Sequence, residues 1–440
     1  MRRALAILAL SLGFAVPALT TPLAPLFARP ALRLIPAVSG LPLKEGVDFE
    51  RLSPDETRQR LQAQIEDSFQ RDDIVAYSRL LHAFGFFPRP VDLRQAYQGF
   101  LEEQAAGFYD HKDRKFYVVE GFDLVHVAAA LQEPVTVAHE LVHAAQDQAM
   151  GLQTLNNHLE FDDDRSRALA FAVEGQATVV GNRVGMPMMP PPYLGPLGVL
   201  TADVFTTSMW LPGSRGMNER MASRGRSGDL PLFLRDGFIA HYYDGSRFVW
   251  AVERSWGKDA HLYMACHPPM STEHALHPAK FMTATDPPLN VEVDVIGFAP
   301  VRRRTPQGEW GLRWLLRRHW DRVAYRTWTG PTPEQAAEGW GGDTMALLAD
   351  DTAVWRIVMD AEHEAQELEP AMQRAMEGAQ VKSSIVRIGR EVQVWVGLEE
   401  DEVSRRSVAL ARAPVDVFPP NPPPPEGSPC WKRPWAPQEQ

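Results

Sequence analysis

Residues 135–148 hold the side chains whose types and spacing could do chemistry. They read VTVAHELVHAAQDQ and contain the pattern H-E-x-x-H as His139, Glu140 and His143. Positions i and i+4 lie on one face of an α-helix, so the two imidazoles can bind one ion. Glu140 follows the first histidine and can reach a water molecule on that ion. Two nitrogen ligands, an open coordination position and a carboxylate base are what a zinc hydrolase needs.

The residues around this motif predict a helix with a buried face. Pro134 suits the first turn of a helix, because the N–H that proline lacks would be unpaired there. Apolar side chains surround the two histidines; they are Ala138, Leu141, Val142, Ala144 and Ala145. The competing interpretation is a pair of histidines that binds nothing.

A later helix supplies the candidate third ligand, Glu174. Three aspartates at residues 162–164 suit the start of that helix, and apolar residues recur through it at helical spacing. A buried carboxylate needs a cationic partner, and zinc is a suitable one. Gly175 and Ala177 should let the helix pack closely on the first one. The expected site is therefore His139, His143, Glu174 and a water molecule.

Other ligands compete with Glu174. His158, Glu160 and the three aspartates lie in a polar segment, where a charge run is expected to be solvated. The longer pattern HExxHxxGxxH is excluded, because Gln146 and Ala149 occupy its glycine and third-histidine positions.

Residues 1–24 have the features of a secretory signal peptide. Arg2 and Arg3 form a positive start, residues 4–14 are apolar, and small residues follow. No later apolar run has the length of a membrane span. The mature chain is therefore predicted to be exported, to the periplasm or outside the cell, without stable insertion into a membrane.

Charge and cysteine content narrow the range of partners. The formal net charge of −11 argues against a nucleic acid, which would favour a basic face. Cys266 and Cys430 could form a disulfide in an oxidising compartment, or could be unrelated. The oligomeric state is not indicated.

Periodicity predicts an α+β chain in two folded parts. A mainly helical part with a small sheet would carry the metal site, and a β-β-α-β-β run over residues 344–396 would form a smaller C-terminal α+β domain. No processing signal indicates whether residues 25–105 act as a propeptide. The predicted divisions are a signal peptide (1–24), an extended leader (25–50), the metal-site domain (51–285), the C-terminal domain (286–412) and a proline-rich, extended or disordered tail (413–440).

Three further segments have two interpretations each. Residues 115–119 are a predicted strand that could pair with an extended substrate, as a strand beside the metal helix commonly does in zinc peptidases, or could belong to an ordinary hairpin. Residues 185–230 lack clear periodicity and would be a loop over the cleft or an irregular surface segment. The polar residues 267–278 would support the zinc ligands or form a structural corner.

The ordered set of motifs resembles the gluzincin class of zinc metallopeptidases. More narrowly, it is similar to poorly characterised exported bacterial HExxH proteins that carry AGFYD, HExxHAxQDQ, EGxAT, PPxSTE with LHP, and GWGGD in this order. These motifs stand here at residues 106–110, 139–148, 174–178, 268–278 and 339–343. His274 occupies a position where glutamine is more usual.

The resemblance covers roughly residues 50–395. It implies a zincin-like α+β fold, with His139, His143 and Glu174 as zinc ligands and Glu140 as general base. It does not indicate which substrate is cut.

The sequence thus predicts an exported zinc-dependent peptidase acting on a peptide or protein. Glu140 would take the proton of the attacking water and pass it to the leaving amine. Tyr242, Tyr243 and His274 are candidate donors to the oxyanion.

Two other functions remain open. The first is a secreted binding or scaffold protein with a structural zinc ion, although such a site would not need the base Glu140. The second is a zinc hydrolase of a non-peptide amide, such as a cell-wall linkage, for which a deep closed pocket is expected.

Overall fold

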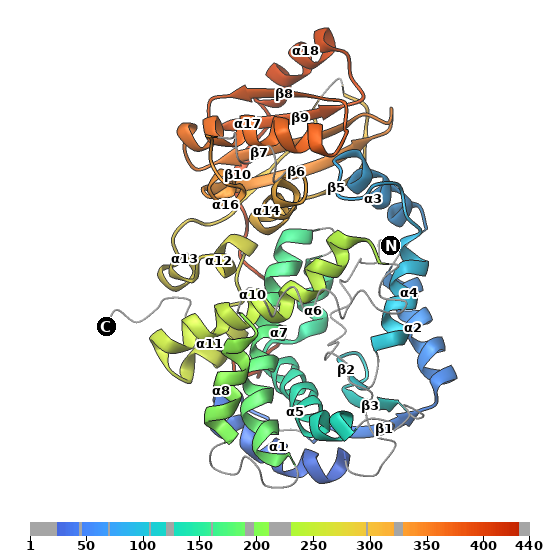
Figure 1. The fold of residues 1–440 in the computed structure, drawn as a ribbon, viewed down its shortest axis with the longest axis vertical. Coiled ribbons are helices and arrows are strands. Elements are labelled where there is room, and N and C mark those ends of the chain that lie inside the picture. The colour runs from blue at the N-terminus through green and yellow to red at the C-terminus, as the bar shows by residue number, and fades with distance from the viewer. Residues whose placement is uncertain are drawn as a thin grey trace.

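The chain folds into a helical part and a sheet-based C-terminal part (Figure 1). This agrees with the predicted α+β class. The predicted signal peptide lies outside the described residues except for Ala24. The computed structural model describes residues 24–43, 46–68, 71–104, 107–119, 127–159, 162–189, 198–210, 230–295, 298–320 and 329–430.

Three long helices form the core of the helical part. Helix α7 (Asp163–Gly185) is buried along nearly its whole length. Helices α5 (Val127–Met150) and α10 (Leu232–Trp256) pack against it (Figure 1). The Asp162 side chain accepts a hydrogen bond from the backbone N–H of Arg165, so the start of α7 is capped as its acidic residues predicted.

Glycines allow these helices to approach closely. A Cβ on Gly181 of α7 would lie 3.0 Å from Cα of His139, so α5 and α7 are nearly in backbone contact at the predicted metal ligand. A Cβ on Gly175 would lie 2.2 Å from the backbone of Gly245 in α10. The expectation that Gly175 faces α5 was therefore wrong, because its face of α7 packs on α10. A Cβ at Gly175 would force α7 and α10 apart, whereas one at Gly181 would need His139 to shift by a few tenths of an ångström.

Helix α5 begins at Val127, so the predicted start at Pro134 was wrong. The proline lies inside the helix, where its ring removes one hydrogen bond of the helical ladder without ending it.

Shorter helices surround this core. They are α1 (Ala24–Ser39), α2 (Pro54–Ser68), α3 (Arg71–Ala83), α4 (Leu93–Gln104), α6 (Leu152–His158), α8 (Gly198–Ser208), α11 (Asp259–Cys266), α12 (Thr272–Leu276) and α13 (Pro278–Thr283), with a 3-10 turn η1 (Met186–Met188).

Helix α1 and strand β1 (Asp48–Leu52) correct the prediction of an extended leader at residues 25–50. The composition suggested extended chain because Pro30 and Pro36 break the helical ladder. Ala28, Ala31 and Ile35 are buried, and α1 packs on α5 and α7. Burial of this apolar face outweighs the two prolines.

A small sheet lies beside α5. Its order is β1-β3-β2, with β2 (Gly107–Asp110) and β3 (Lys115–Val119) antiparallel and β1 parallel to β3. The strand at residues 115–119 is therefore central and cannot offer a free edge to a substrate. That prediction was wrong because it did not foresee β1, which pairs with the outer side of β3.

The C-terminal part is built on an antiparallel sheet in the order β5-β6-β7-β9-β8 (Figure 1). The predicted β-β-α-β-β run is confirmed as β6, β7, α17, β8 and β9, with β5 and α18 as additions. The elements are β5 (Val301–Thr305), α14 (Gly308–Arg318), α16 (Pro333–Ala337), β6 (Trp340–Leu348), β7 (Ala353–Met359), α17 (Glu362–Gly378), β8 (Ser383–Ile388), β9 (Glu391–Val396) and α18 (Glu400–Leu410).

Asp164, at the start of α7, joins the two parts. Its Oδ1 accepts hydrogen bonds from the backbone N–H of Thr272 at 3.0 Å and from the Thr272 hydroxyl at 2.5 Å. Gly308, the first residue of α14, packs against the same carboxylate with φ of +71°. A Cβ there would lie 1.6 Å from Asp164 Oδ1, so the junction requires glycine on both counts.

Asp343 holds the other side of this junction. Its carboxylate accepts the backbone N–H groups of Gln307 at 3.0 Å and Gly308 at 2.9 Å. It also accepts the indole N–H groups of Trp340 at 3.0 Å and Trp355 at 2.7 Å. The GWGGD motif therefore fixes the start of α14 on β6 and β7.

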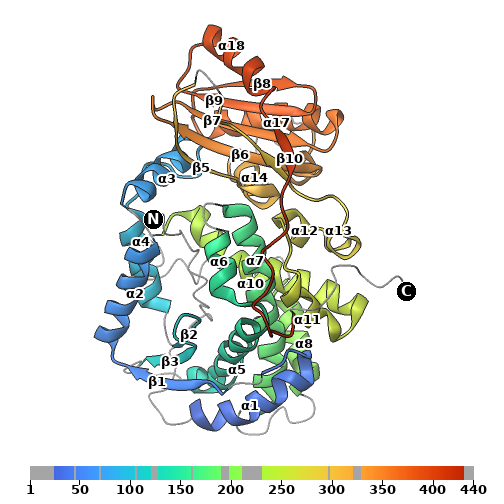
Figure 2. The ribbon, with the colours of Figure 1, turned by 180° about the vertical axis from the view of Figure 1, so that it is seen from behind.

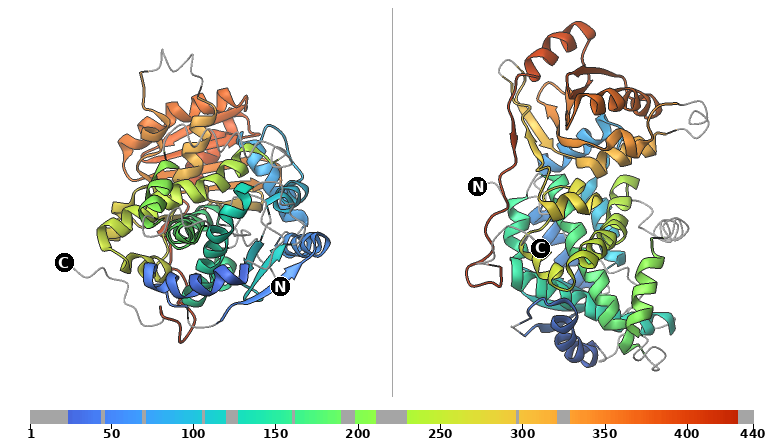
Figure 3. Two further views of the ribbon diagram at one scale, coloured as in Figure 1. Left: turned by 60° about the horizontal axis from the view of Figure 1, so that its bottom comes forward. Right: turned by 90° about the vertical axis from the view of Figure 1, so that its left-hand side faces the viewer.

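The tail after α18 returns along the helical part (Figures 2 and 3). Strand β10 (Val415–Val417) pairs with β4 (Leu289–Val291), and Asn421 then accepts a hydrogen bond of 2.6 Å from Arg165. Cys430 forms a disulfide with Cys266 at the end of α11. Of the two predicted states, the extended one is confirmed for residues 414–425, turns follow over residues 426–430, and residues 431–440 lie outside the described part.

Within the described residues, no helix combines the length and the apolar character needed to cross a membrane. Residues 185–230 are not wholly irregular, because they contain η1 and α8. Residues 190–197 and 211–229 lie outside the described part, so a covering role for them stays a prediction.

Because of this junction, we expect alanine at Gly308 to lower the free energy of unfolding more than alanine at Gly389. Gly308 and Gly389 both have positive φ, of 71° and 58°, but nothing lies within 4 Å of a Cβ added at Gly389. We expect Gly389→Ala to lower the free energy of unfolding by about 1–2 kcal/mol, the cost of left-handed backbone alone. Gly308→Ala should cost at least about 3 kcal/mol, because Asp164 must also move. Equal losses in urea denaturation would contradict this account of the junction.

The disulfide predicts a redox-dependent stability. It closes a loop with a sequence separation of 164, so its loss should lower the free energy of unfolding by about 2–5 kcal/mol. Thermal unfolding with and without reductant measures the effect. The double variant Cys266→Ser/Cys430→Ser is the control and should not respond to reductant. An unchanged Tm of reduced wild type would mean that the disulfide does not stabilise the fold.

Candidate metal centre

Helices α5 and α7 bring the three predicted metal ligands together. His139 Nε2 lies 3.2 Å from Glu174 Oε2, and His143 Nε2 lies 3.7 Å from the same oxygen. One ligand atom of each residue lies within 4.8 Å of the others. All three side chains are buried, with 7%, 3% and 2% of their surface exposed. The geometry thus gives two nitrogens and one oxygen facing a common point.

The electrostatics of this group fit a cation. Burial alone would raise the pKa of Glu174, but the charge of His143 and the hydrogen bond with His139 outweigh it and hold the pKa below its ordinary value. Burial opposes charging of His143 as well, yet Glu174 raises its pKa. His143 Nε2 is buried and has no hydrogen-bond partner among the described residues. A metal ion would supply both the charge and the missing contact.

Glu140 lies beside this group and is fully buried. Its Oε2 accepts a hydrogen bond of 2.9 Å from the backbone N–H of Tyr109 in β2. The Tyr109 hydroxyl donates to Asp147 Oδ2, two turns further along α5 than Glu140, at 3.2 Å. These two bonds fix β2 to the metal helix. The strand at the border of the metal group is therefore β2 and not β3.

Of the three candidate oxyanion donors, Tyr242 lies at the metal group. Its ring centre is 6.1 Å from that of His139, and burial together with the charge of Glu174 raises its pKa well above the ordinary value. Tyr243 belongs with Tyr242 and Ile239 to one buried apolar cluster. His274 Nε2 lies 3.0 Å from the carbonyl oxygen of Asp286, so that ring is engaged elsewhere.

The competing ligands have other partners. Asp163 accepts hydrogen bonds from the Tyr77 hydroxyl at 2.6 Å and from Gln307 Nε2 at 2.9 Å. Asp164 binds Thr272, and burial raises its pKa to about 8. The three aspartates are buried, so the expectation that this charge run is solvated was wrong; they cap α7 and join it to the C-terminal part. His158 is exposed, and Glu160 lies outside the described residues.

The polar segment 267–278 makes contacts at the junction. Thr272 binds Asp164, and His277 Nε2 lies 3.0 Å from Glu309 Oε1 in α14. Of its two predicted roles, the structural corner agrees with these contacts.

A second acidic group lies near this corner. Glu273, Asp286 and Asp360 each approach Lys280, whose Nζ is 2.6 Å from Glu273 Oε1 and 3.6 Å from Asp360 Oδ2. Burial raises the pKa of Glu273 to about 9. The ammonium group already neutralises part of this charge, in contrast to the group around Glu174.

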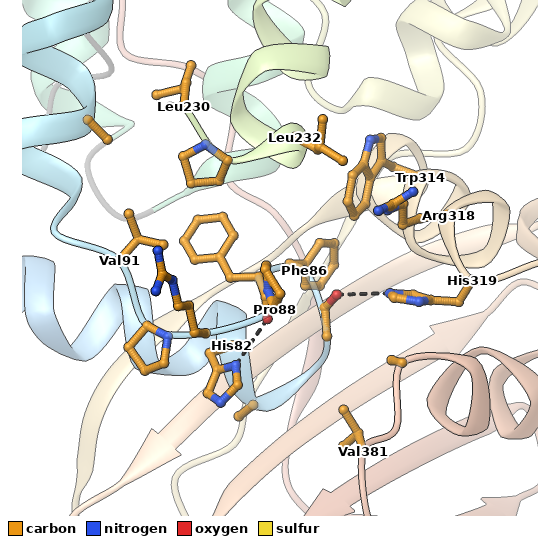
Figure 4. A pocket seen from close by; sticks show the side chains of 18 of the residues that line it. His82, Phe86, Pro88, Val91, Leu230, Leu232, Trp314, Arg318, His319 and Val381 are labelled. Atoms are coloured by element: carbon orange, nitrogen blue, oxygen red, sulfur yellow. Dashed lines mark hydrogen bonds between the residues drawn. The ribbon is translucent and has the colours of Figure 1, made fainter. Parts of the chain in front are cut away.

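The structure also contains a large cavity (Figure 4). Its volume is about 1530 Å³, and it is lined by residues of α3, of the turn after it, of α14 and of the loop after α17. Phe86, Trp314 and Arg318 are among them, and none of its lining residues is a candidate ligand.

Two glutamines behind the metal group were not predicted from the sequence. Gln146 Oε1 lies 2.8 Å from His143 Nδ1, and Gln146 Nε2 donates to Gln176 Oε1 at 2.8 Å. Gln146 follows His143 by three residues, and such a pair shares one helix face. That spacing was a usable signal. The contact with Gln176 depends on how α5 and α7 pack, so no pattern in the sequence indicated it.

Fold and site define a mixed α+β protein with a buried His–His–Glu group that could hold a metal ion. The family model described as Domain of unknown function (DUF8575) matches residues 299–417, which run from β5 to β10 and do not include this group. No curated protein and no solved structure matches the chain.

The geometry predicts which residues bind a metal. Wild type should bind about one zinc ion per chain, and His143→Ala and Glu174→Ala should lose it, because each removes one of three ligands. Elemental analysis after dialysis measures the content. His158→Ala is the matched control and should bind zinc like wild type. Full zinc retention by Glu174→Ala would show that another group is the third ligand.

Proposed function

We propose that the protein is an exported, zinc-dependent metallopeptidase. The observation that carries the proposal is the buried group of His139, His143 and Glu174 with the carboxylate of Glu140 beside it. Two histidines and a glutamate are a common ligand set of hydrolytic zinc sites, which leave one coordination position open. A neighbouring glutamate is the base that such a site needs for hydrolysis.

Each residue has a role in this proposal. Bound zinc would supply Lewis-acid chemistry, polarising the scissile carbonyl and making a water molecule more acidic. Glu140 accepts the proton of the attacking water and delivers it to the leaving nitrogen. The Tyr109 N–H holds the Glu140 carboxylate in place. Tyr242 remains protonated and can donate a hydrogen bond to the oxyanion.

The substrate side of the proposal rests on β2. This strand pairs with β3 on one side, and its Tyr109 N–H faces the metal helix on the other. A peptide that lies beside β2 would pass the metal group, while the Tyr109 N–H stays bonded to Glu140. The substrate class is therefore proposed to be peptides or proteins.

Export is supported by the disulfide between Cys266 and Cys430. Such bonds persist in oxidising compartments and are rare in the cytosol. The proposed location is the periplasm or the exterior of the cell, after removal of residues 1–24.

The mechanism predicts that Glu140→Gln keeps the metal and loses hydrolysis. The amide cannot accept the proton, so the rate of casein or peptide-library cleavage should fall by about 10²–10⁴-fold, while zinc content stays at the wild-type level. Glu377→Gln, an exposed exchange of the same kind on α17, is the control and should leave both unchanged.

Two results would count against the proposal. Wild-type turnover by Glu140→Gln would exclude the assigned base. Zinc-loaded wild type that cleaves no peptide would exclude the peptidase and leave a non-peptide amide or a binding role.

A further inference from the structure

A chain of buried side-chain hydrogen bonds leads away from the metal group, starting at His143. Its Nδ1 lies 2.8 Å from Gln146 Oε1. Gln146 Nε2 donates to the carbonyl oxygen of Val173 at 2.9 Å and to Gln176 Oε1 at 2.8 Å. Gln176 Nε2 in turn donates to the carbonyl oxygen of His261 at 2.9 Å. The side chains of Gln146, Gln176 and His261 are buried.

The backbone carbonyls fix the direction of these bonds. A carbonyl oxygen only accepts hydrogen bonds, so the atom of Gln146 that faces Val173 must be the NH2 group. The amide oxygen of Gln146 then faces His143 Nδ1, which must carry the hydrogen. The carbonyl of His261 orients Gln176 in the same way and turns its oxygen toward Gln146. Neutral His143 is thereby held as the tautomer whose Nε2 is free to bind a metal.

The chain also ties together the helices that carry the ligands. Gln146 lies on α5 with His139 and His143, and Gln176 lies on α7 with Glu174. Beyond Gln176, His261 Nε2 lies 3.3 Å from Glu253 Oε1, and Glu253 binds Arg183 of α7 at 2.5 Å. Contacts among the four helices α5, α7, α10 and α11 therefore hold the two glutamine amides in place.

We infer that Gln146 and Gln176 are positioning residues for the metal ligand His143. Gln146 sets the tautomer and the ring orientation of His143, and Gln176 holds the Gln146 amide in the orientation that does this. Metal-bound histidines commonly give their second N–H to a carboxylate or a carbonyl oxygen. Here a neutral side-chain amide takes that role, so the histidine is oriented without a further negative charge near the metal.

The inference rests on the proposed zinc site and is tested by zinc affinity, measured with a chromophoric competing chelator on the full chain. Gln146→Leu removes the acceptor of the His143 N–H and should weaken zinc binding by about 10–100-fold. Gln176→Leu should weaken it by about 10-fold or less, because it acts through Gln146. Gln148→Leu, two residues further along α5, is the control and should bind like wild type.

Gln146→Glu separates positioning from support of the fold. Its carboxylate can still accept the His143 N–H, but it faces the oxygens of Val173 and Gln176 without a donor. We expect zinc affinity within a few-fold of wild type, together with a lowered Tm of the metal-free protein. Cobalt-loaded protein gives a second readout: the visible absorption spectrum should change in Gln146→Leu and be retained in Gln146→Glu.

Wild-type zinc affinity in Gln146→Leu, or equal losses in Gln146→Leu and Gln146→Glu that follow their stability, would overturn the positioning role while leaving the zinc site intact. If Gln146→Leu does not fold, Gln146→Glu and Gln176→Leu carry the test. A wild-type protein that binds no zinc would overturn both this inference and the proposed function.

Discussion

The carboxylate of Glu174, buried between two imidazoles, is the interaction on which the helical part depends. A charge with 2% of its side-chain surface exposed must be compensated, and the nearest groups able to do so are His139 and His143. Compensation requires α5 and α7 to lie nearly in backbone contact, which Gly181 permits at His139. The close packing of α5 and α7 and the compensation of the Glu174 charge therefore depend on each other. A bound cation would compensate that buried charge.

Helix α7 extends this constraint to the rest of the molecule. Its acidic start binds Thr272 and faces Gly308, which in turn is held by Asp343 in the C-terminal sheet. Glu174 lies ten residues after Asp164, about 15 Å along the helix axis. One rigid, buried helix thus has the junction of the two parts at its end and the candidate metal ligand in its middle. The residues matched by the family model of unknown function include Gly308 and Asp343 at this junction, but not the metal group.

Local sequence patterns predicted the features that are set within a single helix or hairpin. The H-E-x-x-H spacing placed His139 and His143 on one face, and the turns at residues 350–351 and 389–390 located the strands β7, β8 and β9. Tertiary contacts decided the rest. Helix α1 forms despite Pro30 and Pro36 because its apolar face is covered, and β3 is central because β1 pairs with it. The aspartates at residues 162–164 looked solvated because their partners, among them Tyr77 and Thr272, come from distant segments.

The most direct test of the central claim is a crystal structure of zinc-loaded protein with anomalous data on both sides of the zinc absorption edge. We expect one anomalous peak, about 2.0–2.2 Å from His139 Nε2, His143 Nε2 and a Glu174 oxygen. A peak at the acidic group of Glu273, Asp286 and Asp360 instead would contradict it. So would a zinc-soaked crystal with no peak between α5 and α7.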